Sequence, residues 1–312
     1  MSFVSQLRRR VAAAALVCLG QAASPSVAHG QAWVPPKGAG TVSLSTQVID
    51  NTGHRLSDGF LLDDGKSTTV GVYVEGEYAL TDRLSFSLGL PYVFARYIGP
   101  NPTPANLPVD QCKCWHGGWQ DVGGAVRFNV VNRPTFAVTP SVAFGVPSHN
   151  YNYQGEAVVG FGLNEARIAV DAGLRLDFIT PRLSVQAKYS YAFVERVLDI
   201  SHDRSNIATS GAYQANRRFS VGGVVAWQRT HGGLRFGSST GNPFFPPGEF
   251  ASPDLFGQHD RLLRDNNWRL GANAAYSFAG FDVFGSFLRY MGGTDTHAGH
   301  AVTVGLSWPF GV

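Results

Sequence analysis

Two cysteines and a neighbouring histidine are the most reactive group of side chains in this sequence. Cys112, Cys114 and His116 form a Cys-x-Cys-x-His cluster in a proline-rich segment. Two thiols in an exported protein most often form a disulfide, although residues only two apart are awkwardly placed for one. A structural zinc site usually needs four ligands, and no second cluster supplies the rest. We therefore favour a disulfide, with free or otherwise paired thiols as alternatives, and expect no metal site and no other cofactor.

Charged residues at every second position are the other group that could carry a function. Glu75 and Glu77 alternate with the apolar Val74 and Tyr78, so along a strand these charges all point to one face. Two interpretations are open: opposite charges pair across an interior and brace it, or some of them line a polar pathway that selects solutes. The candidates on this face are Glu75, Glu77, Asp121, Arg127, Arg167, Asp171, Arg175, Asp177, Lys188, Arg218 and Arg269.

The elements that must position these charges are extended segments of about ten residues. Residues 70–80 alternate apolar with polar or small side chains, and residues 84–90 continue the pattern after the short connection 81–83. Such alternation predicts strands joined by tight turns. The predicted strands are 41–50, 68–80, 83–96, 119–130, 135–146, 165–178, 182–195, 217–228, 234–240, 266–278, 281–291 and 300–310. Pro91 and Pro140 fall inside two of them, and each predicts an irregularity in strand pairing.

The connections between these segments alternate between long and short. Short ones lie at 81–83, 132–134, 180–182, 229–233 and 279–280, whereas those after the odd-numbered strands are long and polar or rich in proline. This asymmetry is typical of a transmembrane barrel with long external loops, short periplasmic turns and both termini in the periplasm. A tag near Asn101 or Asn206 should then be exposed on intact cells, and a tag at Asn132 hidden.

Aromatic residues at the outward positions support the same arrangement. Near the predicted short turns they are Tyr78, Phe128, Phe136, Phe178, Trp227, Phe278, Trp308 and Phe310, and near the long loops Tyr92, Phe94, Phe144, Tyr191, Phe193 and Trp268. Aromatic girdles at both interfaces are a property of membrane barrels. Because backbone polar groups need partners in hydrocarbon, the sheet must close on itself. The predicted fold class is all-β: a transmembrane antiparallel up-and-down β-barrel of about twelve strands.

The start of the chain predicts export. Arg8, Arg9 and Arg10 precede the apolar residues 11–20, which resemble the basic and apolar regions of a secretory signal and are too short for a membrane-spanning helix. We expect a signal peptide over 1–30, an N-terminal periplasmic segment over 31–40 and a barrel over 41–312. The apolar Trp33, Pro35 and Pro36 either lead into the first strand or plug the periplasmic mouth.

Composition agrees with a barrel in lipid. Charged residues make up 15% of the chain, against about 25% in soluble domains. The formal charge of +3 falls to zero without the three signal arginines, which gives no case for nucleic acid as a partner. We expect the bacterial outer membrane as the location, with its lipid and lipopolysaccharide, the barrel-assembly machinery and a small-molecule solute as partners.

Catalysis is the less favoured interpretation. Lipid-modifying outer-membrane enzymes often carry a His-x-Ser motif on the membrane-facing wall, and no histidine here has a serine at that spacing. A triad from distant residues is the alternative. The histidines at 54, 149, 202, 259 and 297 fall mostly in expected external loops, where histidine is usually solvated.

Several segments resemble a known group of proteins. Residues 32–38 (AWVPPKG), 189–195 (YSYAFVE), 259–264 (HDRLLR) and 296–299 (THAG) are similar to outer-membrane proteins related to the transporter family named for the meta-pathway of phenol degradation, and more distantly to long-chain fatty-acid channels. The resemblance implies uptake of small, often aromatic or hydrophobic molecules and assigns no site residue. A structural or adhesion barrel with ligand-binding external loops is the alternative function.

Overall fold

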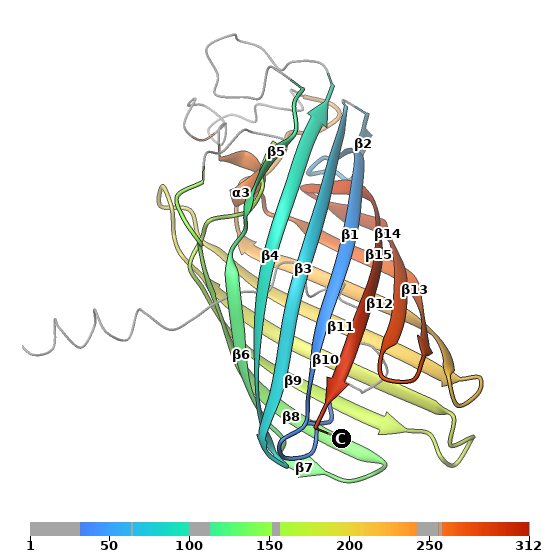
Figure 1. The fold of residues 1–312 in the computed structure, drawn as a ribbon. Coiled ribbons are helices and arrows are strands. Elements are labelled where there is room, and N and C mark those ends of the chain that lie inside the picture. Colours follow the sequence, from blue (N-terminus) through green and yellow to red (C-terminus); the bar gives the residue numbers. More distant parts are fainter. Residues whose placement is uncertain are drawn as a thin grey trace, which may run out of the picture.

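The chain closes into one antiparallel β-barrel of twelve strand positions (Figure 1). The computed structural model describes residues 32–63, 65–99, 113–151, 157–241, 255 and 258–311. The wall consists of β1 (Gly40–Arg55), β3 (Lys66–Thr81), β4 (Leu84–Ile98), β5 (His116–Trp119) with β6 (Val122–Phe128), β8 (Phe136–Val146), β9 (Glu165–Arg175), β10 (Leu183–Val194), β11 (His202–Gln214), β12 (Phe219–Gly232), β13 (Asn266–Ser277), β14 (Asp282–Thr294) and β15 (Thr296–Phe310). The short β2 (Leu61–Leu62), β7 (Val131–Asn132) and α3 (His259–Leu262) lie at its ends.

The first and last strands close the barrel. β1 pairs with β15 from Gly40 opposite Phe310 to Arg55 opposite Thr296, and on its other side β1 pairs with β3. Because every long strand has two neighbours, the backbone polar groups are satisfied within the wall, as a bilayer requires. Among the described residues, no helix is long and apolar enough to cross a membrane.

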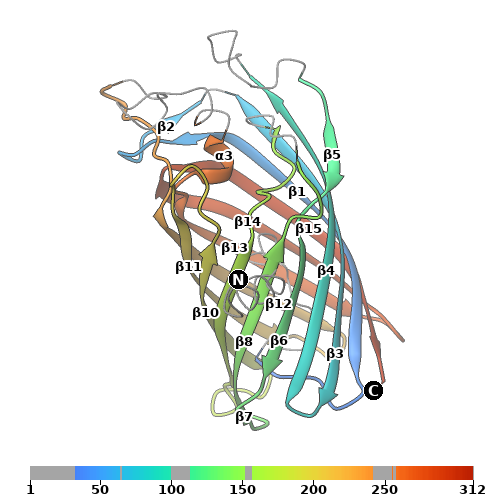
Figure 2. The same cartoon turned by 90° about the vertical axis from the view of Figure 1, so that its left-hand side faces the viewer.

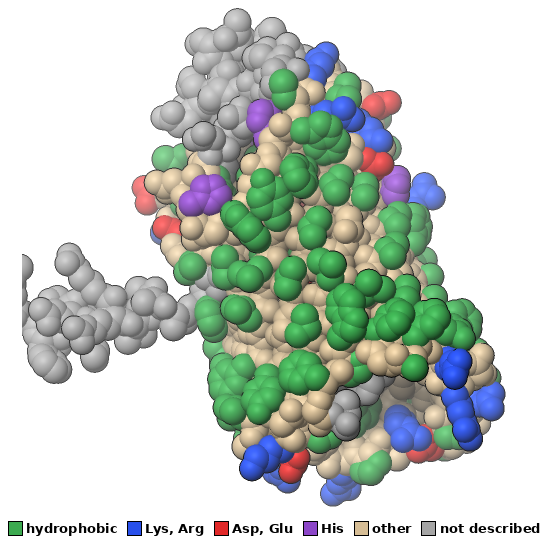
Figure 3. Space-filling model, in the orientation of Figure 1, with side chains coloured by type: hydrophobic (Ala, Val, Ile, Leu, Met, Phe, Trp, Pro, Cys, Tyr) green, Lys and Arg blue, Asp and Glu red, His purple; other side chains and the backbone are tan. Residues whose placement is uncertain are grey.

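Side-chain parity separates an apolar outside from a polar inside. On β1, Val42 and Leu44 are more than 40% exposed, whereas Ser45 and Gln47, which follow them on the opposite face, are buried. Figure 3 shows the same division on one face: hydrophobic side chains cover the middle of the wall, and charged ones gather toward the two ends. This surface is what a strand wall in lipid needs, and it confirms the predicted fold class.

The turns and loops also separate by end. One end of the barrel carries β7 and the C-terminus (Figure 1). The connections at this end are short: 82–83, 129–135, 176–182, 215–218 and 278–281. The strand ends at the opposite, external end (Figures 1 and 2) are separated in the sequence by longer intervals, which the strand bounds give as 56–65, 99–115, 147–164 and 233–265. Both Gly40 and Phe310 lie at the short-turn end. The predicted alternation therefore holds for most of the chain.

One region differs from the prediction. The structure has a strand, β11, over residues expected to be an external loop, and no strand at 234–240. Since one strand is missing and one is added, the total stays at twelve, but β12 runs in the opposite direction to that predicted. The residues 229–233 therefore end a strand at the external side and form no periplasmic turn, and Trp227 pairs with Trp268 near the external end. Asn206 lies within β11 and is no loop site for a tag.

A second correction concerns the last external connection, which was expected to be long. β14 and β15 are joined through Asp295 alone, which has a positive φ of 52°. The irregularities at the prolines are confirmed. Pro91 lies opposite the break between β5 and β6, and the pairing along β8 shifts from β6 to β7 across Pro140.

The external end has a hydrophobic core of its own. Leu56, Leu163, Leu234 and Leu262 are almost fully buried in one cluster, together with Phe236 and Leu263. They come from connections on different sides of the barrel, including α3. Burial of large aliphatic side chains stabilises by roughly 1.5–3 kcal/mol each, so these connections pack as a cap over the lumen.

Candidate functional site

The lumen holds a cavity of about 700 Å³ lined by side chains from most of the wall. Its polar lining includes Gln47, Arg167, Lys188 and Asn273, and its aromatic lining includes Tyr73. Residues of the external cap and of the N-terminal segment line its two ends. The cavity is therefore an internal compartment of the barrel with mixed polar and apolar walls.

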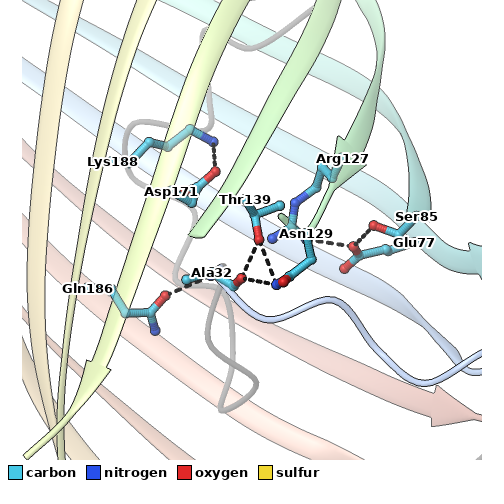
Figure 4. A network of polar contacts seen from close by, with 9 residues as sticks. All are labelled: Ala32, Glu77, Ser85, Arg127, Asn129, Thr139, Asp171, Gln186 and Lys188. Atoms are coloured by element: carbon cyan, nitrogen blue, oxygen red, sulfur yellow. Dashed lines mark hydrogen bonds and ion pairs between the residues drawn. The ribbon is translucent and has the colours of Figure 1, made fainter. Parts of the chain in front are cut away.

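The N-terminal segment, defined here as residues 32–38, runs from Ala32 inside the lumen (Figure 4) to the short-turn end, where the Lys37 amide donates to Asp82 and the Gly38 amide to the carbonyl of Ala79. The carbonyl of Ala32 accepts hydrogen bonds from Asn129 Nδ2 (3.1 Å) and from Thr139 Oγ1, and its amide donates to Gln186 Oε1 (3.2 Å). Ala32 is fully buried. The indole N–H of Trp33 donates to the carbonyl of Arg133 at 3.0 Å. These contacts hold the segment against one part of the wall, where β8, β9 and β10 lie side by side.

The sequence-predicted charges meet in pairs beside this segment. Arg127 on β6 and Glu77 on β3 form an ion pair of 2.6 Å, and Ser85 also donates to this carboxylate (Figure 4). Asp171 on β9 lies 3.6 Å from Lys188 on the adjacent β10. Both pairs join charges that the sequence assigns to the lumen face. Their geometry matches the bracing interpretation for these four residues.

A third ionic group was only partly anticipated. Glu165 on β9 contacts Arg167, as well as Arg204 of β11, and both Arg204 and Glu165 are almost fully buried. Sequence reasoning selected Arg167 but missed Arg204, because it lay in a segment read as loop. The signal available was its alternation with His202 and Asn206, both of which also line the cavity.

The remaining candidates have different positions. Arg175 and Arg269 line the cavity, with Arg175 3.3 Å from Asp177, and Arg269 lies over the ring of Tyr290. Glu75 is half-buried on the inward face of β3.

Two other candidates lie near the ends of the barrel. Asp121 is buried and accepts a 2.8 Å hydrogen bond from Tyr151 in an external connection. Burial and this carboxylate raise the pKa of Tyr151. Arg218 is exposed in the β11–β12 turn, away from the lumen, because β12 begins only at Phe219.

The cysteine and histidine predictions have separate outcomes. Cys114 is disulfide-bonded, and Cys112 lies outside the described residues. The expectation that the loop histidines are solvated is wrong for three of them, since His54, His202 and His259 are each less than 7% exposed. Each is covered by the external cap or by the connections around it.

A serine and a histidine do meet on the outward face. Ser205 Oγ lies 2.8 Å from Nε2 of His231, which comes from the neighbouring strand β12. The nearby carboxylate of Asp203 accepts hydrogen bonds from the Tyr191 hydroxyl and the Val194 amide, and Ser205 is only 6% exposed. Among the described residues, no carboxylate hydrogen-bonds to His231, and Ser205 is buried, so the arrangement seen here is not that of a catalytic triad.

The wall, its apolar surface and its polar lumen together define the class of protein: an outer-membrane β-barrel. Among solved structures, the chain is similar to the COG4313 outer membrane channel from Pseudomonas putida F1, with a TM-score of 0.67 and 13% identity over 91% of this chain and 100% of that chain. It is also similar to the NanC porin (TM-score 0.49, 8% identity, 85% and 98% covered) and to the CymD monoaromatic hydrocarbon channel (TM-score 0.47, 10% identity, 88% and 89% covered). At 13% identity, the likeness to the COG4313 channel shows a shared fold.

The sequence comparisons add no family assignment. No protein-family model matches the chain, and no curated protein matches it.

Proposed function

We propose that this barrel is an outer-membrane channel for the uptake of small molecules and that residues 32–38 close its periplasmic mouth. The observation that carries the proposal is the cavity of about 700 Å³ inside the wall, with the N-terminal segment seated at one end. A cavity of several hundred Å³ is the size of a small-molecule site. The shared fold with an outer membrane channel supports the same function.

The lining indicates the chemical class of solute. Trp33, Tyr73 and Phe161 present aromatic surface to the cavity, while Arg167 and Lys188 present charge. Aromatic rings bind flat apolar molecules, and a few placed polar groups orient them. A small aromatic or hydrophobic compound with one polar or anionic group would satisfy both parts of this lining.

The direct test measures transport with and without the N-terminal segment. Purified protein in planar bilayers should show low conductance, and deletion of residues 31–36 should raise it. The double variant Thr139→Val, Asn129→Leu removes two donors to the Ala32 carbonyl and should raise conductance as well. Thr46→Val, an exposed outward position on β1, is the matched control and should change nothing.

Solute flux into liposomes completes this test. Benzoate or phenol should enter vesicles that contain the deletion variant faster than vesicles that contain the wild-type protein. If neither protein conducts ions or carries solute, the channel is contradicted, and the alternative of a structural or adhesion barrel gains support.

A further inference from the structure

Three potential metal ligands meet at the external end of the lumen. His54 lies near the end of β1, His297 is its direct partner on β15, and Asp260 belongs to α3 in the long β12–β13 connection. One nitrogen or oxygen of each residue lies within 4.8 Å of those of the others. Because these residues are far apart in sequence, spacing gave no sign of the cluster.

The ligand atoms of this cluster lie about as far apart as neighbouring ligand atoms around one bound zinc ion. Nε2 of His297 lies 3.3 Å from Oδ1 of Asp260, and Nε2 of His259 lies at the same distance from that oxygen. Zinc binds imidazole nitrogen and carboxylate oxygen at about 2.0–2.2 Å in a tetrahedral arrangement, which separates neighbouring ligand atoms by roughly 3.4 Å. The rings of His54 and His297 lie 4.7 Å apart, so small side-chain rotations bring the third ligand into range.

The donor set suits a divalent transition metal. One carboxylate oxygen and two imidazole nitrogens are ligand atoms that zinc accepts in proteins. Histidine imidazoles are good ligands for zinc, copper and nickel.

The surroundings hold the ligands in place. His54 is 6% exposed and packs edge-on against Phe236, with 4.8 Å between ring centroids. The amide of Phe236 donates to Oδ1 of Asp295, the residue that joins β14 to β15. Leu262 of α3 belongs to the same apolar cluster as Phe236. An apolar shell around fixed ligands is typical of protein metal sites.

We propose that His54, Asp260 and His297 bind one zinc ion or a similar divalent transition metal, with His259 supporting Asp260. The ion joins the β12–β13 connection to the seam between β1 and β15. Asp260 and His297 also line the cavity, so the bound ion faces the lumen. This proposal does not depend on transport.

The test measures metal binding by the full chain, produced without a polyhistidine tag, in detergent. Isothermal titration with zinc chloride at pH 7.5 should give about one ion per chain, and Co²⁺ should give the visible absorption of a tetrahedral site. Asp260→Asn and His297→Gln should each weaken zinc binding at least tenfold. His149→Gln, a histidine of another external connection, is the matched control and should bind zinc as the wild type does.

Two further observations keep the result interpretable. Heat-modifiable migration on gels shows whether each variant is folded, and Asp260→Asn alters a residue of α3, which is not part of the barrel wall. Binding should weaken from pH 7.5 to 5.5, since ligating imidazoles must be deprotonated. Failure of the wild type to bind zinc, or equal binding by Asp260→Asn and the wild type, overturns the proposal.

Discussion

At the scale of single residues, the lumen is organised by charges that meet partners on other strands. Alternation places Glu77 and Arg127 on one face, and in the structure the two side chains form an ion pair (Figure 4). Their pairing was not predictable, because β4 lies between their strands and they are 50 residues apart. The inward or outward orientation of a residue follows from the sequence of its own strand, whereas a contact between strands two apart in the wall depends on the stagger of three strands.

The Glu77–Arg127 pair should contribute to stability more than to permeation. Glu77→Gln leaves the Arg127 guanidinium without its counter-charge in a partly exposed site, which should cost about 2 kcal/mol, less than the 3–5 kcal/mol for a fully buried pair. Denaturant unfolding in detergent measures the loss. The double variant Glu77→Gln, Arg127→Met should recover part of it. A variant with altered ion selectivity and unchanged stability would instead favour a pore-lining role.

Gly173 provides the space in which the N-terminal segment sits. A Cβ atom at this position would lie 2.3 Å from the Trp33 ring and 2.7 Å from the Ala32 side chain. Gly173→Ala should therefore displace the segment and raise single-channel conductance. Gly76→Ala is the control, because the nearest atom to its added Cβ would lie 4.0 Å away. Equal conductance of both variants would show that the segment does not restrict the pore.

At the scale of elements, strands with an apolar outward face were predictable and one without it was not. The outward positions of β11 hold Asp203, Ser205 and Thr209 among few large apolar residues, so no apolar alternation marks it. Residues 234–240 are the opposite case, because they were predicted to form a strand and do not. Leu234 and Phe236 alternate as in a strand, but both are buried in the external cap and not exposed to lipid. Alternating apolar residues show that one face of a segment is shielded from water. That face can contact lipid, or it can pack against other parts of the protein.

The corrected topology can be tested with epitope tags. A tag after Thr240, in the external β12–β13 connection, should be accessible to antibody on intact cells, whereas a tag at Asn216, in the β11–β12 turn, should be accessible only after permeabilisation. A tag at Asn206 should prevent folding, since it interrupts β11. Surface exposure of the Asn216 tag would reverse the orientation assigned to this region.

At the scale of the whole molecule, the closed barrel predicts simple bulk properties. Detergent-solubilised protein should give a circular dichroism spectrum dominated by β-structure. Unheated samples should migrate differently from heated ones on mildly denaturing gels, because a closed sheet resists unfolding by detergent. Cell fractionation should place the protein in the outer membrane, and recovery of folded protein in the soluble periplasmic fraction would contradict this.

The seam between β1 and β15 has a consequence for the order of assembly. It joins the two ends of the barrel sequence, as in the 3.0 Å hydrogen bond from Gln47 to Thr303, 256 residues apart. Contacts of such long sequence separation carry the largest loop-closure entropy and are favoured only when the intervening hairpins already exist. Closure at this seam is therefore the last step of folding. The residues just before β1 must then be drawn into the lumen as the wall closes around them, or enter afterwards through the periplasmic opening.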